Sequence, residues 1–175
     1  MATADQNTHL LDQASILAER FSPRAADFDQ ARKLDQDASD AMAEAGFYRL
    51  FVPEQLGGLE ASPVVSAQIF ERLAQGSAAC GWVAFIAATS GSTLGSIPEE
   101  TARAIFTHPN TMVAGVFAPS GKAKVDAGQA TVNGRWQWGS GTQNADWVLG
   151  GCMVDTGAEK PSQHMVLMPT SEVQF

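Results

Sequence analysis

Cysteine, tyrosine and charged residues are all scarce in this 175-residue sequence. It contains two cysteines, one tyrosine and 17% charged residues, against 45% hydrophobic residues. Cys80 and Cys152 form no C-x-x-C pair, which indicates free thiols in a reducing compartment rather than a disulfide framework. Nineteen acidic residues against eleven Lys and Arg residues leave a net charge of −8. Because nucleic-acid binding requires a basic surface, we expect no nucleic-acid partner.

The sequence also lacks a long hydrophobic run. Its most apolar stretch, around residues 78–88, is shorter than the roughly 20 residues that span a bilayer. The first residues are polar and acidic, whereas a secretory signal begins with basic residues and continues with an apolar core. We therefore expect a cytoplasmic protein without a membrane partner.

Several common catalytic motifs are missing. Gly139 and Gly141 could begin a G-x-G-x-x-G dinucleotide loop, but Asn144 stands where the third glycine is needed. No phosphate-binding loop of the G-x-x-x-x-G-K-S/T type occurs. The three histidines are scattered along the chain without the spacing of metal ligands, so we expect no metal site.

The hydrophobic pattern changes character near residue 108. Before it, apolar residues repeat with a helical period, as in Leu10, Ala14, Leu17 and Phe21, and again over residues 34–45 and 65–73. After it, short apolar segments alternate with glycine-containing turns, which predicts strands at 112–118, 122–126, 130–132, 135–138, 147–154 and 165–168. Helices followed by strands indicate an α+β fold. We expect an N-terminal helical bundle domain over residues 1–108 and an antiparallel, barrel-like β-domain over residues 109–175.

Residues 133–147 carry the most informative local pattern. Asn133-Gly134 favours a type I′ turn, so a hairpin is predicted there. Trp136 and Trp138 lie two apart on the predicted following strand and would face the same side. Residues 139–141, Gly-Ser-Gly, leave bare backbone beside the two indoles. Aromatic faces, a hydroxyl and open amides suit a flat ring such as flavin, although two indoles that fill a barrel core are the simpler interpretation.

Four segments follow, in order and spacing, the pattern of one enzyme superfamily. Residues 45–58, AGFYRLFVPEQLGG, are similar to its GL…L…PEEYGG segment, and residues 71–74, ERLA, to its E-x-L-A helix. Residues 116–123, VFAPSGKA, stand where it has a T-E-P-G-x-G-S-D loop, and residues 133–146 are similar to N-G-x-K-x-W-I-T-N…A-D. Together these segments resemble the acyl-CoA dehydrogenase superfamily.

The resemblance implies an N-terminal helical domain, a middle β-domain and a C-terminal four-helix bundle. On this comparison the sequence ends inside the β-domain, so we expect a fragment that lacks the bundle and its catalytic base. We also expect such a chain to be inactive alone, and the protein to form a homo-oligomer.

The resemblance further implies a flavoprotein oxidoreductase that binds FAD or reduced FMN. By this comparison, Trp138 would pack on the flavin ring and Ser140 would hydrogen-bond near its N5 and O4. Trp136 falls on the superfamily's lysine position and is expected only to pack. Three further residues would contact the pyrimidine edge through their backbone: Phe117, Ala118 and Pro119.

Departures from the superfamily pattern bear on the reaction. Phe117 and Ala118 replace the T-E of the loop, and Ala123 stands near the serine that would help hold coenzyme A. These differences favour the superfamily's flavin-dependent monooxygenases, which hydroxylate a small substrate with flavin from a partner reductase. Dehydrogenation of an acyl-CoA-type substrate, with an electron-transfer partner, stays open. A non-catalytic scaffold that binds or oligomerises is the third alternative.

Overall fold

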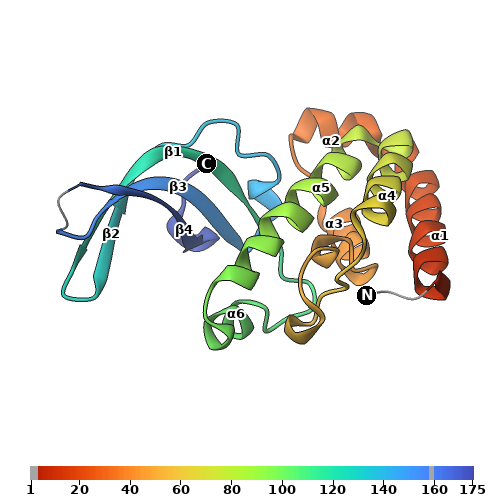
Figure 1. The fold of residues 1–175 in the computed structure, drawn as a ribbon. Coiled ribbons are helices and arrows are strands. Elements are labelled where there is room, and N and C mark those ends of the chain that lie inside the picture. Colours follow the sequence, from red (N-terminus) through yellow and green to blue (C-terminus); the bar gives the residue numbers. More distant parts are fainter. Residues whose placement is uncertain (1–3, 158–159) are drawn as a thin grey trace.

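The computed structural model describes residues 4–157 and 160–175. Helices occupy one side of the molecule and a four-stranded sheet the other (Figure 1). The last helix, α6, ends at Ile105 and the first strand, β1, begins at Val113. The change from helix to strand therefore occurs where the sequence pattern changes.

Local sequence explains where the helices begin. The Asp35 carboxylate accepts a hydrogen bond from the Ala38 N–H at 2.9 Å and caps α3. The Ser62 hydroxyl caps α4 in the same way, and Pro63 takes the first helical position, where its missing N–H costs nothing. The helices of the described residues are α1 (Ala4–Phe21), α2 (Ala25–Ala31), α3 (Gln36–Glu44), α4 (Pro63–Gly76), α5 (Ala78–Ser92) and α6 (Glu99–Ile105).

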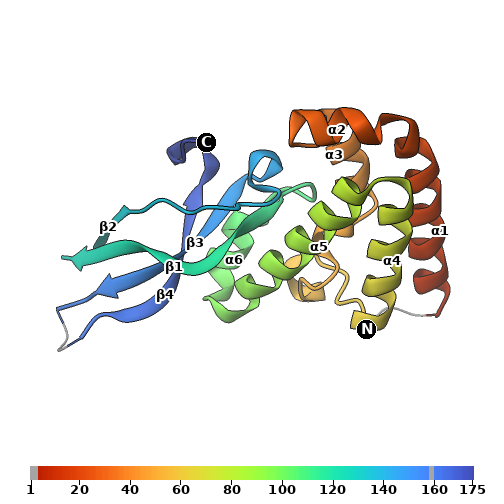
Figure 2. The same ribbon diagram turned by 90° about the horizontal axis from the view of Figure 1, so that it is seen from above.

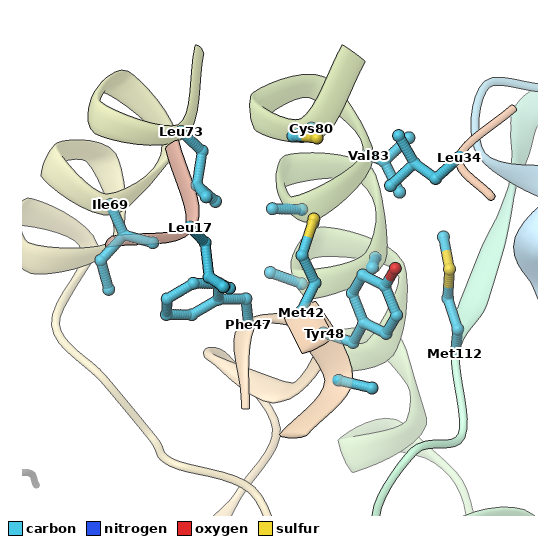
Figure 3. Close-up of a cluster of buried hydrophobic side chains, with 14 of the residues drawn as sticks. Leu17, Leu34, Met42, Phe47, Tyr48, Ile69, Leu73, Cys80, Val83 and Met112 are labelled. Carbon is cyan, nitrogen blue, oxygen red and sulfur yellow. The ribbon is translucent and has the colours of Figure 1, made fainter. Parts of the chain in front are cut away.

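Helix α5 forms the centre of the helical part, as its apolar residues on nearly every side predict. Figure 3 shows Leu34 and Met112 on one side of the helix that carries Val83, and Ile69 and Leu73 on the other. A short turn extends α5 to Ser96, and by length and composition alone the segment Ala78–Ser96 could cross a membrane. It is thus longer than the apolar run seen in the sequence. Half of its apolar window is buried inside the fold, as in the core helix of a globular protein.

The sheet has the strand order β2-β1-β3-β4 and is mixed rather than wholly antiparallel. Its strands are β1 (Val113–Asp126), β2 (Gln129–Asn133), β3 (Trp147–Asp155) and β4 (Ser162–Pro169). Pairs β1–β2 and β3–β4 are antiparallel, whereas β1 and β3 are parallel. The parallel pair arises because residues 134–146 carry the chain back to the start of β1 before β3 begins. The sheet lies beside α5 and α6, with α1 and α4 farther away (Figure 2).

The hairpin between β1 and β2 closes at Ala127-Gly128, and the prediction of a turn at Asn133-Gly134 is wrong. Ala127 and Gly128 have φ angles of +48° and +81°, the positive pair that a type I′ turn needs. Asn133 is instead the last residue of β2 and pairs with Lys122. Glycine is needed at position 134 because of close packing, since a Cβ there would lie 2.7 Å from the Trp136 ring.

Two strands predicted separately, over 112–118 and 122–126, are the single strand β1 with a bulge. Its register against β3 shifts between Val116 and Gly121, where residues 117–120 oppose only Gly151. The bulge folds closely over that glycine. A Cβ on Gly151 would lie 2.3 Å from the Phe117 carbonyl oxygen.

Candidate functional site

Trp136 is an anchor on the sheet. Its indole Nε1 donates a hydrogen bond to the Gly151 carbonyl at 2.8 Å, and the ring is half-buried. Glycines on both neighbouring strands make room for it: a Cβ would lie 2.4 Å from the ring at Gly121 and 2.7 Å at Gly150. Burial raises the pKa of the adjacent Cys152 thiol, so this sulfur packs as a neutral group. The sequence prediction that Trp136 packs is consistent with this geometry.

Trp138 lies in the opposite environment. Its side chain is 92% exposed, and its φ angle is +64°, which is rare for a bulky residue. The predicted strand over 135–138 does not form, and the two indoles do not fill a common core. A residue held in this unfavourable backbone region, with its apolar ring in solvent, points to a functional constraint rather than to packing.

The turn after Trp138 is tightly bonded to itself. The Ser140 N–H donates to the Trp138 carbonyl at 2.8 Å, and the Thr142 hydroxyl donates to the Gly139 carbonyl at 2.6 Å. Gly141 has a φ angle of +73° and packs against Met112. Among the described residues, the Ser140 hydroxyl makes no hydrogen bond of its own. It therefore remains free to bond a ligand.

Trp138 borders an open groove of about 970 Å³. Strand residues Val116, Val148 and Met168 supply an apolar part of its lining. Arg32 from the end of α2 and Arg135 add two guanidinium groups, against the single side-chain carboxylate of Glu172. The groove is thus locally more cationic than a chain with net charge −8, and it combines an aromatic face with positive charge.

The five residues predicted to contact a cofactor fall into two neighbouring segments. Trp138 lines the groove directly, and half-buried Ser140 follows it in the same turn. Phe117, Ala118 and Pro119 form the exposed bulge of β1, immediately after the groove residue Val116. Of the five, only Trp138 is a lining residue of the groove; the other four follow a lining residue within three positions of the chain.

Sequence reasoning missed Arg32 and Asn144. Arg32 has a left-handed φ angle of +56° at the end of α2, a short helix that the sequence pattern did not predict. Asn144 is half-buried and bonds to Leu34, which is 110 positions away in the sequence. A local sequence pattern cannot predict a contact between residues 110 positions apart.

Helices followed by a curled mixed sheet define an acyl-CoA dehydrogenase-like fold. Residues 3–104, more than half of the chain, match the family described as the acyl-CoA dehydrogenase N-terminal domain. The chain belongs to this family, which confirms the resemblance seen in the sequence motifs.

Relatives of this chain are named as monooxygenases, the branch that the sequence favoured. The chain is 33% identical to the indole-3-acetate monooxygenase of Pseudomonas putida, over 89% of this chain and 40% of that protein. It is 32% identical to HsaA, the oxygenase subunit of a flavin-dependent monooxygenase from Rhodococcus jostii (strain RHA1), over 84% of this chain and 39% of that protein. The crystal structure of the HsaA monooxygenase from M. tuberculosis matches with a TM-score of 0.85 and 27% identity, over 95% of this chain and 46% of that chain.

The chain spans about two fifths of the length of the curated relatives it matches.

Proposed function

We propose that this chain forms the flavin-facing part of the oxygenase component of a flavin-dependent monooxygenase. The observation that carries the proposal is the exposed, conformationally strained Trp138 beside a groove with two guanidinium groups. The names of the relatives support the reaction class. Dehydrogenation of an acyl-CoA has no comparable support among them.

The groove fits a flavin in size and chemistry. Ligand pockets commonly enclose about 300–1,000 Å³, and this groove lies at the upper end of that range. We assign Trp138 to one face of the flavin ring and the free hydroxyl of Ser140 to a hydrogen bond with its edge. The backbone of Phe117, Ala118 and Pro119 would bound the pyrimidine side. Arg32 and Arg135 would suit the flavin phosphate.

When bound, a reduced flavin supplies the electrons that activate O₂ for insertion into a substrate. The contribution of this chain would be to hold the ring, orient it and shield it from water. By analogy with the relatives, we propose a small aromatic substrate and a partner flavin reductase. We also propose a cytoplasmic location, a homo-oligomer and the domain division 1–108 and 109–175.

Titration of the protein with FMN, reduced FMN and FAD tests the proposal by quenching of flavin or tryptophan fluorescence. Trp138→Ala should weaken binding by about tenfold through loss of an aromatic contact. Ser140→Ala should weaken it by about 2- to 13-fold, the equivalent of one neutral hydrogen bond of about 0.5–1.5 kcal/mol. Trp82→Ala is the control, because Trp82 is also exposed but does not line the groove.

Absence of flavin binding by the unaltered protein would reject the proposal and favour the scaffold alternative. Equal losses in the Trp82 and Trp138 variants would place the flavin elsewhere. Reduction of the bound flavin by an acyl-CoA would favour the dehydrogenase alternative.

A further inference from the structure

The side-chain amide of Asn144 bonds to the backbone of one distant residue through both of its polar atoms. Its Oδ1 accepts from the Leu34 N–H at 3.0 Å, and its Nδ2 donates to the Leu34 carbonyl at 2.9 Å. An asparagine in a turn usually bonds to its own backbone neighbours. In Asn144, both polar side-chain atoms bond instead to a residue 110 positions away in the sequence.

Leu34 is a firm attachment point. Its side chain is 1% exposed and belongs to the main hydrophobic core, where it lies near Val83 of α5 (Figure 3). The residue stands between the left-handed end of α2 at Arg32 and the capping residue of α3, Asp35. Its backbone is therefore held on both sides, and a group that bonds to it is held with it.

The two hydrogen bonds between Asn144 and Leu34 form a clamp. Its other end is the turn that carries Trp138 and Ser140. The Asn144 N–H donates to the Gly141 carbonyl at 3.0 Å, and the Thr142 N–H donates to the Gly139 carbonyl at 3.2 Å. With the bond from the Ser140 N–H to the Trp138 carbonyl, these short-range bonds make residues 138–144 a compact unit. Displacement of Asn144 would displace the whole unit, including the strained residue at its start.

The same clamp sets the position of a second part of the groove wall. Arg32 lies two residues before Leu34, and Gln143 lies one residue before Asn144; both line the groove. The pair of hydrogen bonds thus joins the helical part of the wall to the loop part. Because Leu34 belongs to the hydrophobic core of the helical half, these bonds fix the distance between Arg32 and the turn.

We propose that Asn144 is a positioning residue, which fixes Trp138 and Ser140 relative to Arg32 and so presets the groove for its ligand. This rests on the proposed function only in naming that ligand as a flavin. Asn144 does not contact the ligand; it acts through the turn.

The first test needs no flavin. The protein is labelled with 5-fluorotryptophan, and its four tryptophan resonances are recorded by ¹⁹F NMR, with Trp138 assigned from Trp138→Ala. In Asn144→Ala, the Trp138 resonance should shift or change width while that of Trp82 stays in place. Asn144→Asp keeps the acceptor for the Leu34 N–H but sets a second oxygen against the Leu34 carbonyl, so the Trp138 resonance should change there too, which covers the case in which the alanine variant does not fold.

An unchanged Trp138 resonance in both variants would overturn the proposal. So would equal changes in all four resonances, because the residue would then support the fold in general. Asn110→Ala is the control for loss of an asparagine side chain, since Asn110 is exposed and lies outside the groove.

The second test measures FMN affinity in a double-mutant cycle. Asn144→Ala should weaken binding by about tenfold in the unaltered protein and by less than about threefold in the Trp138→Ala background. Asn110→Ala, the control of the first test, should leave FMN affinity within about twofold, because Asn110 lies outside the groove. Full additivity with Trp138→Ala would overturn the positioning role, whereas absence of FMN binding by the unaltered protein would reject only the proposed function.

Discussion

Replacement of Gly121 by alanine tests whether the slot around Trp136 determines the geometry of the sheet. A Cβ at Gly121 would lie 2.4 Å from Cζ2 of Trp136 and 2.6 Å from the Cys152 sulfur. Both distances are far below van der Waals contact, and the strand backbone on either side is hydrogen-bonded to its neighbours. The indole and the Cys152 sulfur are therefore the groups that must move.

The structure sets the size of the effect. Overpacking of this kind costs about 1–3 kcal/mol. Movement of the ring also breaks the 2.8 Å hydrogen bond from Trp136 Nε1 to Gly151, at about 0.5–1.5 kcal/mol. We expect a total loss of about 1.5–4.5 kcal/mol in the free energy of unfolding. For a chain of this length, each kcal/mol corresponds to about 2–4 °C in Tm.

Urea denaturation followed by circular dichroism measures the loss, and a double-mutant cycle identifies its cause. In a Trp136→Leu background, Gly121→Ala should cost less, because the shorter side chain removes the closer of the two clashes and leaves only that with the Cys152 sulfur. Gly95→Ala is the control, since a Cβ there meets only Pro53 at an ordinary 3.5 Å. If Gly121→Ala costs the same with and without the indole, the steric explanation is wrong.

Two further predictions concern the hairpin and the cap of α3. Gly128→Val should lower the unfolding free energy by about 1–2 kcal/mol in urea denaturation, because φ is +81° there; an unchanged midpoint would contradict the turn. The hydrogen bond from Arg24, and then that from the Ala38 N–H, lower the pKa of Asp35. Its stabilisation is therefore present above the unfolded-state pKa, about 3.9, and is lost as pH falls through the folded-state pKa. Asp35→Asn, which keeps the cap, should lose less stability between pH 5 and pH 2 than the unaltered protein, and parallel curves would refute this.

Helices and family were readable from the sequence because the signals are local. The spacing from Leu10 to Phe21 follows from the 3.6-residue helical turn, and it places those residues in the core wherever the helix docks. The motif segments preserve their order and spacing, so they identified the family without any knowledge of contacts. For the same reason the sequence singled out Trp138, which proves to line the groove.

Strand pairing and the surroundings of each indole were decided by tertiary structure. Asn133-Gly134 has the stronger local turn preference, but Ala127-Gly128 closes the hairpin because the strands around it pair over residues 122–133. Trp136 and Trp138 look alike in sequence, yet only Trp136 meets the glycines of neighbouring strands.

The sequence by itself thus determined the helical half, the presence of a strand-rich second half and the segments that form the candidate site. Only the tertiary structure decided the parallel pairing of β1 with β3, the closing turn of the hairpin and the bonds between Asn144 and Leu34. The physical reason is the range of the interactions. Periodicity and turn preference act over a few residues, whereas pairing, close approach and the amide clamp join residues that are distant in sequence and become neighbours only when the core has formed.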